Sequence, residues 1–352
     1  MDVNKRNIEY WQKRFEKVLV SNEALALKYQ QQLIKIYEQV KIDVEKELQA
    51  FYNRYSTETG LDMSEVKKRL TPKQLRSFKV QQEKYLNKVE ELISMGADLE
   101  PYSNQLKKLS GRAYVSRLQE LQYNLNSQIM ILTGEQQVAI TDIMKQSYLQ
   151  GFTQSMFALQ QGVGFGMSFT VPNNDDVLKV VSNNWNGHNY STSIWTNKSK
   201  LTNWLSTDLA RHFAAGSSVE EMSTDLVSKL DTNYKSAVRL VRTEVNYISN
   251  QSTMDAYENS NVVDKYQILA TLDSRTSEIC RDMDGQVYNV KDKQVAVNMP
   301  PFHVNCRTTT IPYFDDDDYE DLTRIARGSD GEVYYVPANM TYREWEKKFT
   351  NL

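Results

Sequence analysis

The chain contains few cysteine, histidine, proline or glycine residues. Its 352 residues include 2 Cys, 3 His, 7 Pro and 13 Gly. Two cysteines in this length exclude a disulfide scaffold and are typical of a protein that folds in a reducing compartment. We find no nucleophile elbow, no zinc-protease motif and no phosphate-binding loop, so the common catalytic motifs are missing as well.

Long apolar runs are also absent. The best candidate for a membrane-spanning helix, Met156–Val171, is interrupted by Gln160, Gln161 and three glycines, and such a helix needs about 20 apolar residues. The first residues, MDVNKRNIEYWQKRFEKV, carry charge without an apolar segment after them. We therefore predict no signal peptide and no membrane anchor. We expect the protein to stay in the cytoplasm or to assemble into something made there.

The composition is that of a folded protein, with 40% hydrophobic, 25% charged and 11% aromatic residues. The charge is uneven along the chain. Residues 1–160 hold 23 Lys and Arg against 19 Asp and Glu, whereas the remainder holds 19 against 26. The basic excess in the first part indicates an anionic partner, and we predict weak, non-specific DNA binding by residues 1–160. Solvated helix faces are the alternative explanation.

Residues 1–160 are predicted to be helical almost throughout. Apolar side chains recur at three- and four-residue steps, beginning with Trp11, Phe15 and Val18, as on the buried stripe of an amphipathic helix. Thr71 is a predicted N-cap with Pro72 at the first helical position. Predicted breaks between helices fall at Thr59-Gly60, Thr71-Pro72, Met95-Gly96, Ser110-Gly111 and Thr133-Gly134.

The pattern changes after residue 160. Gly162–Val171 is predicted to be a strand or an irregular crossing segment, and residues 173–260 return to helix, with one helix starting near Thr202. The segments KYQILATLDS, GQVYNV and RTTTIPYF are β-rich. We therefore predict an α+β protein with a helical N-terminal region (1–160), a compact mixed domain (161–315) and a tail (316–352) with a short β piece and a terminal helix.

Both cysteines lie in one unusual region. Cys280 falls in DSRTSEICRDMDGQVY, and His303 and Cys306 follow in PPFHVNCRTTTIPYF. Two thiolates and an imidazole are ligands of tetrahedral zinc, so Cys280, His303 and Cys306 are candidate ligands of one structural zinc ion. Asp273, Asp282, Asp284 or a water molecule could complete the set. Plain packing of the thiols and a Cys280–Cys306 disulfide remain alternatives.

These segments resemble the phage minor head protein family, the Mu F-like head-morphogenesis proteins. The resemblance rests on GHNYSTSIWTN, AVRLVRTEVNYI, ATLDSRTSEICRDMDGQVY and PPFHVNCRTT, in that order, and covers roughly residues 180–315. Members of the family usually end the last motif with Cys-Arg-Cys, whereas this chain has Cys306-Arg307-Thr308, and that departure weakens the metal assignment.

The resemblance implies a structural role without catalysis. Such a protein would be a low-copy minor capsid component of a tailed bacteriophage, in the capsid interior or near the portal. It would be made in the host cytoplasm and would act in head assembly, with DNA packaging or ejection as further roles. Its partners would be the portal protein and the major capsid or scaffolding protein.

Specific roles can be suggested for charged residues in the matching segments. Arg242 and Glu244, on one predicted helix, are expected to form an ion-pair network with Arg275. Arg307 is expected to point to a carboxylate or a phosphate.

The alternative is an enzyme of the arginine ADP-ribosyltransferase class, which some phage head proteins carry. That chemistry uses a Ser-Thr-Ser strand and a Glu-x-Glu loop, and the chain contains Ser191-Thr192-Ser193 and Glu344-Trp345-Glu346. The Ser-Thr-Ser sequence lies inside GHNYSTSIWTN, and the resemblance to the head protein family already accounts for that segment. The two glutamates fall in a helical pattern, in which they would point about 200° apart.

Overall fold

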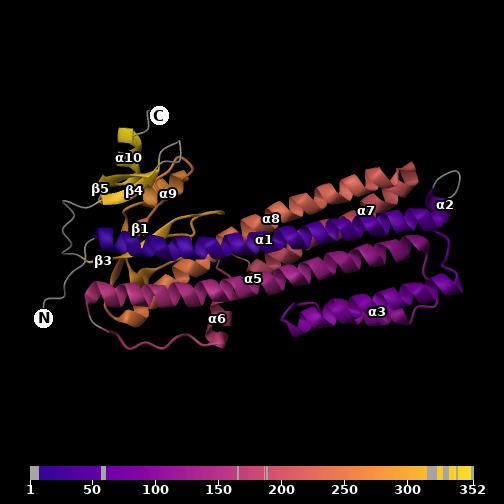
Figure 1. The fold of residues 1–352 in the computed structure, drawn as a ribbon, viewed down its shortest axis with the longest axis horizontal. Helices are drawn as coiled ribbons and strands as arrows, with labels where there is room; N and C mark the ends of the chain where they lie inside the picture. Colours follow the sequence, from indigo (N-terminus) through magenta and orange to yellow (C-terminus); the bar gives the residue numbers. More distant parts are fainter. Residues whose placement is uncertain are drawn as a thin grey trace. The chain divides into compact units, whose positions relative to one another are not determined.

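The computed structural model describes residues 8–56, 61–164, 166–185, 187, 189–314, 323–327, 333–337 and 340–349. These residues are mostly helical, with a small three-stranded sheet and a two-stranded one (Figure 1). This agrees with the predicted α+β class. The helices are α1 (Ile8–Tyr55), α2 (Met63–Val66), α3 (Pro72–Ser94), α4 (Glu100–Ser110), α5 (Arg117–Val163), α6 (Asn174–Val181), α7 (Tyr190–Ala215), α8 (Val219–Ser260), α9 (Glu278–Met283), the 3-10 turn η1 (Val290–Asp292) and α10 (Tyr342–Phe349). The strands are β1 (Lys265–Leu269), β2 (Val287–Asn289), β3 (Thr309–Tyr313), β4 (Thr323–Arg327) and β5 (Val333–Pro337).

The chain divides into two compact units. Met1–Lys28, Asp142–Asn189 and Arg239–Leu352 form one, which we call the mixed unit because it contains every described strand. Tyr29–Thr141 and Tyr190–Val238 form the other, which we call the helical unit. The long helices α1, α5 and α8 each contribute residues to both units.

Side-chain caps fix the starts of two helices, and the cap at Thr71 is the one predicted from the sequence. Thr71 Oγ1 accepts a hydrogen bond from Gln74 N, Thr71 N in turn donates to Gln74 Oε1, and Pro72 occupies the first turn of α3. Ser218 and Glu221 form the same reciprocal pair at the start of α8. Each cap satisfies backbone N–H groups that have no partner inside the helix.

The three-stranded sheet has the order β2-β1-β3 and is antiparallel throughout. Tyr266 on β1 pairs with Tyr288 on one side and Pro312 on the other. These strands match the three β-rich segments that the sequence predicts. In the mixed unit, β4 and β5 form an antiparallel pair, and α10 packs against α9 beside it (Figure 1).

The core of the mixed unit joins the sheet to the ends of three long helices. Trp11 and Phe15 from α1, Phe152 from α5 and Tyr257 from α8 are each 1% exposed or less and belong to one cluster with Tyr266 of the sheet. Burying side chains of this size contributes roughly 2 kcal/mol each. Cys280 and Cys306 belong to the same cluster, so two of the three candidate metal ligands are part of this core.

One predicted helix break is wrong. α5 runs without interruption through Thr133-Gly134, because Gly134 serves close packing in the helical unit and does not end the helix. A Cβ atom at this position would lie 2.6 Å from Leu99 Cδ1 and 3.1 Å from Leu92 Cδ1. The predicted helix start near Thr202 is also wrong, since α7 begins at Tyr190 and continues to Ala215.

Gly162–Val171 contains no strand among its described residues. α5 continues to Val163, and residues 166–171 have no regular secondary structure. Of the two predictions for this segment, a strand or an irregular crossing segment, the structure agrees with the second. Gly162 is required because a Cβ atom there would lie 2.0 Å from the Trp11 ring. The predicted break at Thr59-Gly60 lies outside the described residues, as do His188 and the acidic run Asp315–Asp318.

None of the helices, over the part of the chain that the structure describes, combines the length and the apolar character that spanning a membrane requires.

Candidate metal centre

Two short segments of the mixed unit carry the three candidate ligands. Cys280 lies on α9, which starts after the loop that follows β1. His303 and Cys306 lie on the loop that precedes β3, where Cys306 N donates to His303 O over 3.2 Å. Asn305 takes the left-handed conformation with φ 60°, and its N–H donates to Thr243 Oγ1 on α8 over 3.1 Å. The loop is therefore fixed to the long helix directly before Cys306.

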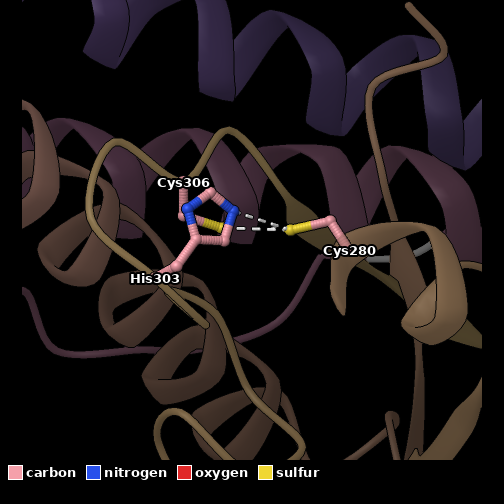
Figure 2. Close-up of side chains that lie close together, drawn as sticks. All are labelled: Cys280, His303 and Cys306. Atoms are coloured by element: carbon pink, nitrogen blue, oxygen red, sulfur yellow. Dashed lines mark hydrogen bonds between the residues drawn. The ribbon is translucent and has the colours of Figure 1, made fainter. Parts of the chain in front are cut away.

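The three side chains converge (Figure 2). Cys280 Sγ lies 3.2 Å from His303 Nε2 and 3.7 Å from Cys306 Sγ. All three ligand atoms lie within 4.8 Å of one another. Zinc–sulfur and zinc–nitrogen bonds of about 2.3 and 2.0 Å place ligand atoms on one ion roughly 3.5–4 Å apart, so small shifts would accommodate a zinc ion. Cys280 and Cys306 are buried, at 2% and 3% exposed.

The imidazole of His303 is oriented for a ligand role. Its Nδ1 lies 2.8 Å from the backbone oxygen of Val304. Because a carbonyl oxygen only accepts, Nδ1 must carry a proton, and Nε2 of the neutral ring then offers its lone pair. Metal-bound histidines commonly use such a backbone contact to fix the tautomer. Ser277 Oγ lies 2.7 Å from Nε2.

The electrostatics favour one thiolate in this cluster. A hydrogen bond from Cys280 lowers the pKa of Cys306 against the opposing effect of burial. The hydrogen bond to Cys306 and burial raise the pKa of Cys280. Contact with Cys306 also raises the pKa of His303, although burial acts the other way. A metal ion binds cysteine sulfurs as thiolates, so a bound ion would compete with the proton on Cys280.

The aspartates suggested as a fourth ligand are engaged elsewhere. Asp273 binds Arg307, Asp282 binds Arg343, and Asp284 accepts from Ala270 N and Tyr342 N. Over the described part of the chain, the cluster that could hold a metal consists of Cys280, His303 and Cys306 alone. Three protein ligands leave the fourth tetrahedral position to water or to an outside group.

Thr308 occupies the position where the family usually has a third cysteine. Its side chain is 1% exposed, and its hydroxyl forms a hydrogen bond with Cys280. Its backbone oxygen accepts from Asn246 and Asn250 of α8 at 3.1 and 3.2 Å. Thr308 thus keeps the packing and a polar contact but supplies no thiolate. Both cysteines are free thiols in this structure.

A buried ion pair supports the loops on either side of the cluster. Arg307 Nη1 and Nη2 each donate to the Asp273 carboxylate over 2.7 Å. Asp273 also accepts from Arg275 N and Thr276 Oγ1. The expectation that Arg307 points to a carboxylate is confirmed. From the sequence, Asp273 is expected only as a possible metal ligand, and its role as the partner of Arg307 is not predicted.

Glu244 does not form the predicted ion-pair network. Its carboxylate accepts a hydrogen bond from Trp185 Nε1 over 3.0 Å, and the Trp185 ring stacks on Tyr247 with centroids 5.0 Å apart. Arg275 instead lies 3.6 Å from Asp273. Burial raises the pKa of Glu244 to about 7, although the Trp185 hydrogen bond lowers it. Glu244 is thus a buried acid whose charge the fold disfavours.

We expect the Glu244→Gln variant to be more stable than the wild type at pH 8 and about equal to it at pH 4. The pKa of Glu244 is higher in the folded state than in the unfolded state, so the wild type loses stability as the pH rises from about 4 to about 7. Glutamine has no proton to lose, and the gain at pH 8 should be about 1–3 kcal/mol. Urea unfolding at both pH values measures it. Equal stabilities at pH 8 would show that Glu244 ionises without cost.

The candidate residues for ADP-ribosyl transfer have structural contacts. Ser191-Thr192-Ser193 lies in the first turn of α7, whereas the enzyme alternative requires a strand. Glu344 and Glu346 lie on α10. Glu344 accepts from Thr341 N at 2.8 Å, and Glu346 accepts from Arg281 at 2.5 Å. Glu344 therefore stabilises the start of α10, and Glu346 stabilises the packing of α10 against α9.

The remaining described histidine also has a structural environment. His212, on α7 in the helical unit, lies 3.0 Å from Ser217 Oγ and 3.3 Å from Asp225 Oδ2. These contacts indicate a structural role for His212.

Comparison with known proteins gives three findings. Residues 203–311 match the family described as Phage Mu protein F like protein. The chain is 24% identical over 225 residues to a minor head protein of Bacillus phage SPP1, a match that spans 59% of this chain and 71% of that protein. It is 22% identical over 240 residues to a protein of Enterococcus faecalis named NAD(+)–arginine ADP-ribosyltransferase EFV, spanning 64% of this chain.

The enterococcal match spans only 49% of that relative, so the chain covers about half of its length. No solved structure matches the chain. The matched segment 203–311 contains Cys280, His303, Cys306 and the Asp273–Arg307 pair, which are the residues that carry the geometry described above. The resemblance predicted from the motifs is thus confirmed, since residues 203–311 are similar to the Mu F-like family and the chain is similar to a phage minor head protein.

Proposed function

We propose that the protein is a low-copy minor capsid protein that lies in the capsid interior near the portal and acts in head assembly. The observation that carries this proposal is the match of residues 203–311 to the Mu F-like family together with the match to the SPP1 minor head protein. The proposed partners are the portal protein and the major capsid or scaffolding protein. DNA packaging or ejection is a further proposed role. In this proposal, residues 161–315, which the sequence predicts as one compact domain, form the head-morphogenesis domain.

We further propose that Cys280, His303 and Cys306 hold one structural zinc ion. The convergence of the three ligand atoms and the burial of both sulfurs support the proposal. A bound ion would join α9 to the loop before β3 and add to the Ser277–His303 hydrogen bond and the Asp273–Arg307 pair, which already link that loop to the segment before α9. The proposed role is to hold these loops together, and no reaction step is assigned to the ion.

Mass spectrometry of purified virions and of empty procapsids tests the proposed location. We expect the protein in both particles, at a stoichiometry far below that of the major capsid protein. A head assembly protein is already present in the empty procapsid, whereas a factor that enters with the DNA is found only in the virion. Absence from both particles would contradict the proposal and would favour a free cytoplasmic enzyme.

DNA contact by residues 1–160 is part of the proposal. Several basic groups there already have partners, such as Arg117 with Glu65 at 2.9 Å and Lys107 with Glu90 at 2.8 Å. The remaining charge supports only weak binding, which should fall steeply with salt. Filter retention of duplex DNA at low salt tests it, and no retention would exclude it.

The named enterococcal relative is the one observation that favours an enzyme. We do not propose catalysis for this chain, because half of that relative lies outside the match and because Ser191–Ser193 is helical here.

A further inference from the structure

The two free thiols of the candidate metal centre lie close enough to react with each other (Figure 2). Cys280 Sγ and Cys306 Sγ are 3.7 Å apart, although the two residues are 26 positions apart in the chain. The sulfurs of a disulfide lie about 2.05 Å apart, so these two atoms have to approach by roughly 1.7 Å. The chain contains no other cysteine. The one disulfide that a single chain can form therefore joins α9 to the loop before β3.

A cavity of about 410 Å³ in the mixed unit gives access to one of the two cysteines. Its walls come from α1, from α8 and from the loops that precede α9 and β3. Cys306 is part of the lining, whereas Cys280 is not. The volume falls in the range of pockets that hold small ligands, so a small molecule can be accommodated beside Cys306. A thiol-reactive molecule that enters the cavity would meet Cys306 first.

Two contacts hold the segments around the cysteines together without using a sulfur atom. Arg307, next to Cys306, donates to Asp273 in the loop before α9 over 2.7 Å. Ser277 Oγ, at the start of α9, lies 2.7 Å from His303 Nε2. Neither contact is lost when the thiols are oxidised. The folded chain has therefore already brought the two sulfurs together, which an unfolded chain must do at an entropic cost.

We propose that Cys280 and Cys306 form a redox-sensitive pair, which is a dithiol in the reducing cytoplasm and a disulfide once the protein reaches an oxidising environment. The Cys306 thiolate attacks one sulfur of a small-molecule disulfide, whose S–S bond breaks and releases one thiolate. The Cys280 thiolate then attacks Cys306 Sγ and displaces the second thiolate. Two cysteine thiols are thereby oxidised and one small-molecule disulfide is reduced. The two protons of the cysteine thiols end on the two released thiolates.

Oxidation would change what holds α9 to the loop before β3. The disulfide uses both sulfurs that the proposed zinc ion needs as thiolates, so the covalent bond and the ion exclude each other. The same two segments are joined by the ion in the cytoplasm and by the disulfide outside the cell. This inference deepens the proposed head function, on which it rests only for the statement that the protein leaves the cell in a particle.

The disulfide content of the full-length protein in buffers of reduced and oxidised glutathione tests the proposal. A chelator is present throughout, so the result does not depend on the zinc ion. Intact mass spectrometry after acid quenching detects the loss of two hydrogen atoms. The reference is the same chain unfolded in concentrated urea, which must close the loop between Cys280 and Cys306 before it can form the bond. At equal glutathione ratios, we expect the ratio of disulfide to dithiol to be at least about tenfold higher in the native protein.

Two variants test the order of the steps. Cys280→Ser should accumulate a mixed disulfide between glutathione and Cys306. Cys306→Ser should react at Cys280 at least about tenfold more slowly, because Cys280 does not line the cavity.

Three results would overturn the proposal. They are a ratio of disulfide to dithiol in the native protein that does not exceed that of the unfolded chain, disulfide-linked dimers in place of the intramolecular bond, and equal rates for the two variants. These measurements need neither zinc nor a phage particle. Their failure is therefore separable from a failure of the zinc proposal and from absence of the protein in virions.

Discussion

The Asp273→Asn variant is expected to lose about 3 kcal/mol of unfolding free energy. Asp273 is 5% exposed and accepts both hydrogen bonds of the Arg307 guanidinium, and asparagine would leave that cation half-buried without a counter-charge. Breaking one partner of a buried pair is costly because the other charge stays desolvated. Urea unfolding at pH 7, followed by circular dichroism, measures the loss.

The matched control is Asp282→Asn. Asp282 binds Arg343 at 2.6 Å, but both side chains are exposed, so its loss should cost less than about 1 kcal/mol. Similar losses in the two variants would show that the Asp273–Arg307 pair contributes no more than a surface contact.

The pH dependence gives a second test of the same pair. Burial acts to raise the pKa of Asp273, but the hydrogen bonds and charge of Arg307 outweigh it, and the pKa is lowered. The pair therefore stabilises the folded state above the unfolded pKa of about 4, and this contribution is lost as the pH falls below that value. Stability of Asp273→Asn should fall less than that of the wild type between pH 5 and pH 3.

The Cys306→Ser variant should lose its metal and about 3–5 kcal/mol of stability. Because one lost ligand already abolishes binding, adding Cys280→Ser should cost less than about 1 kcal/mol more. A strong chelator should lower the wild type to the level of the variant and leave the variant unchanged. Thermal or urea unfolding with and without chelator measures these differences.

Ser277→Ala is the control for this series, because it removes hydrogen bonds to His303 Nε2 and Cys280 without removing a candidate ligand, and it should cost about 1 kcal/mol. Additive losses for the two cysteines, with no effect of chelator on the wild type, would indicate two independently packed thiols.

The sequence predicts the convergence of the cluster well because chemistry and chain order coincide there. His303 and Cys306 are three residues apart on one turn, and Cys280 lies on α9, in the connection between β1 and β2. The caps of α3 and α8 were also predictable, since they depend on residues three positions apart.

Contacts between distant segments were not predictable. Gly134 was interpreted as a break, but its reason is the approach of Leu92 and Leu99, far away in sequence. Glu244 was paired with arginines by proximity on a helix, whereas burial against Trp185 decides its environment. Asp273 and Arg307 are 34 residues apart, and only the fold brings them together. Local spacing carries no information on such pairs.

The most direct test of the metal assignment is the zinc content of the purified wild-type protein beside Cys306→Ser, by elemental mass spectrometry after dialysis. If Cys280, His303 and Cys306 hold a structural ion, the wild type contains one zinc per chain and the variant contains almost none. Zinc at background level in both proteins would contradict the account and leave two reduced, packed thiols beside a hydrogen-bonded histidine.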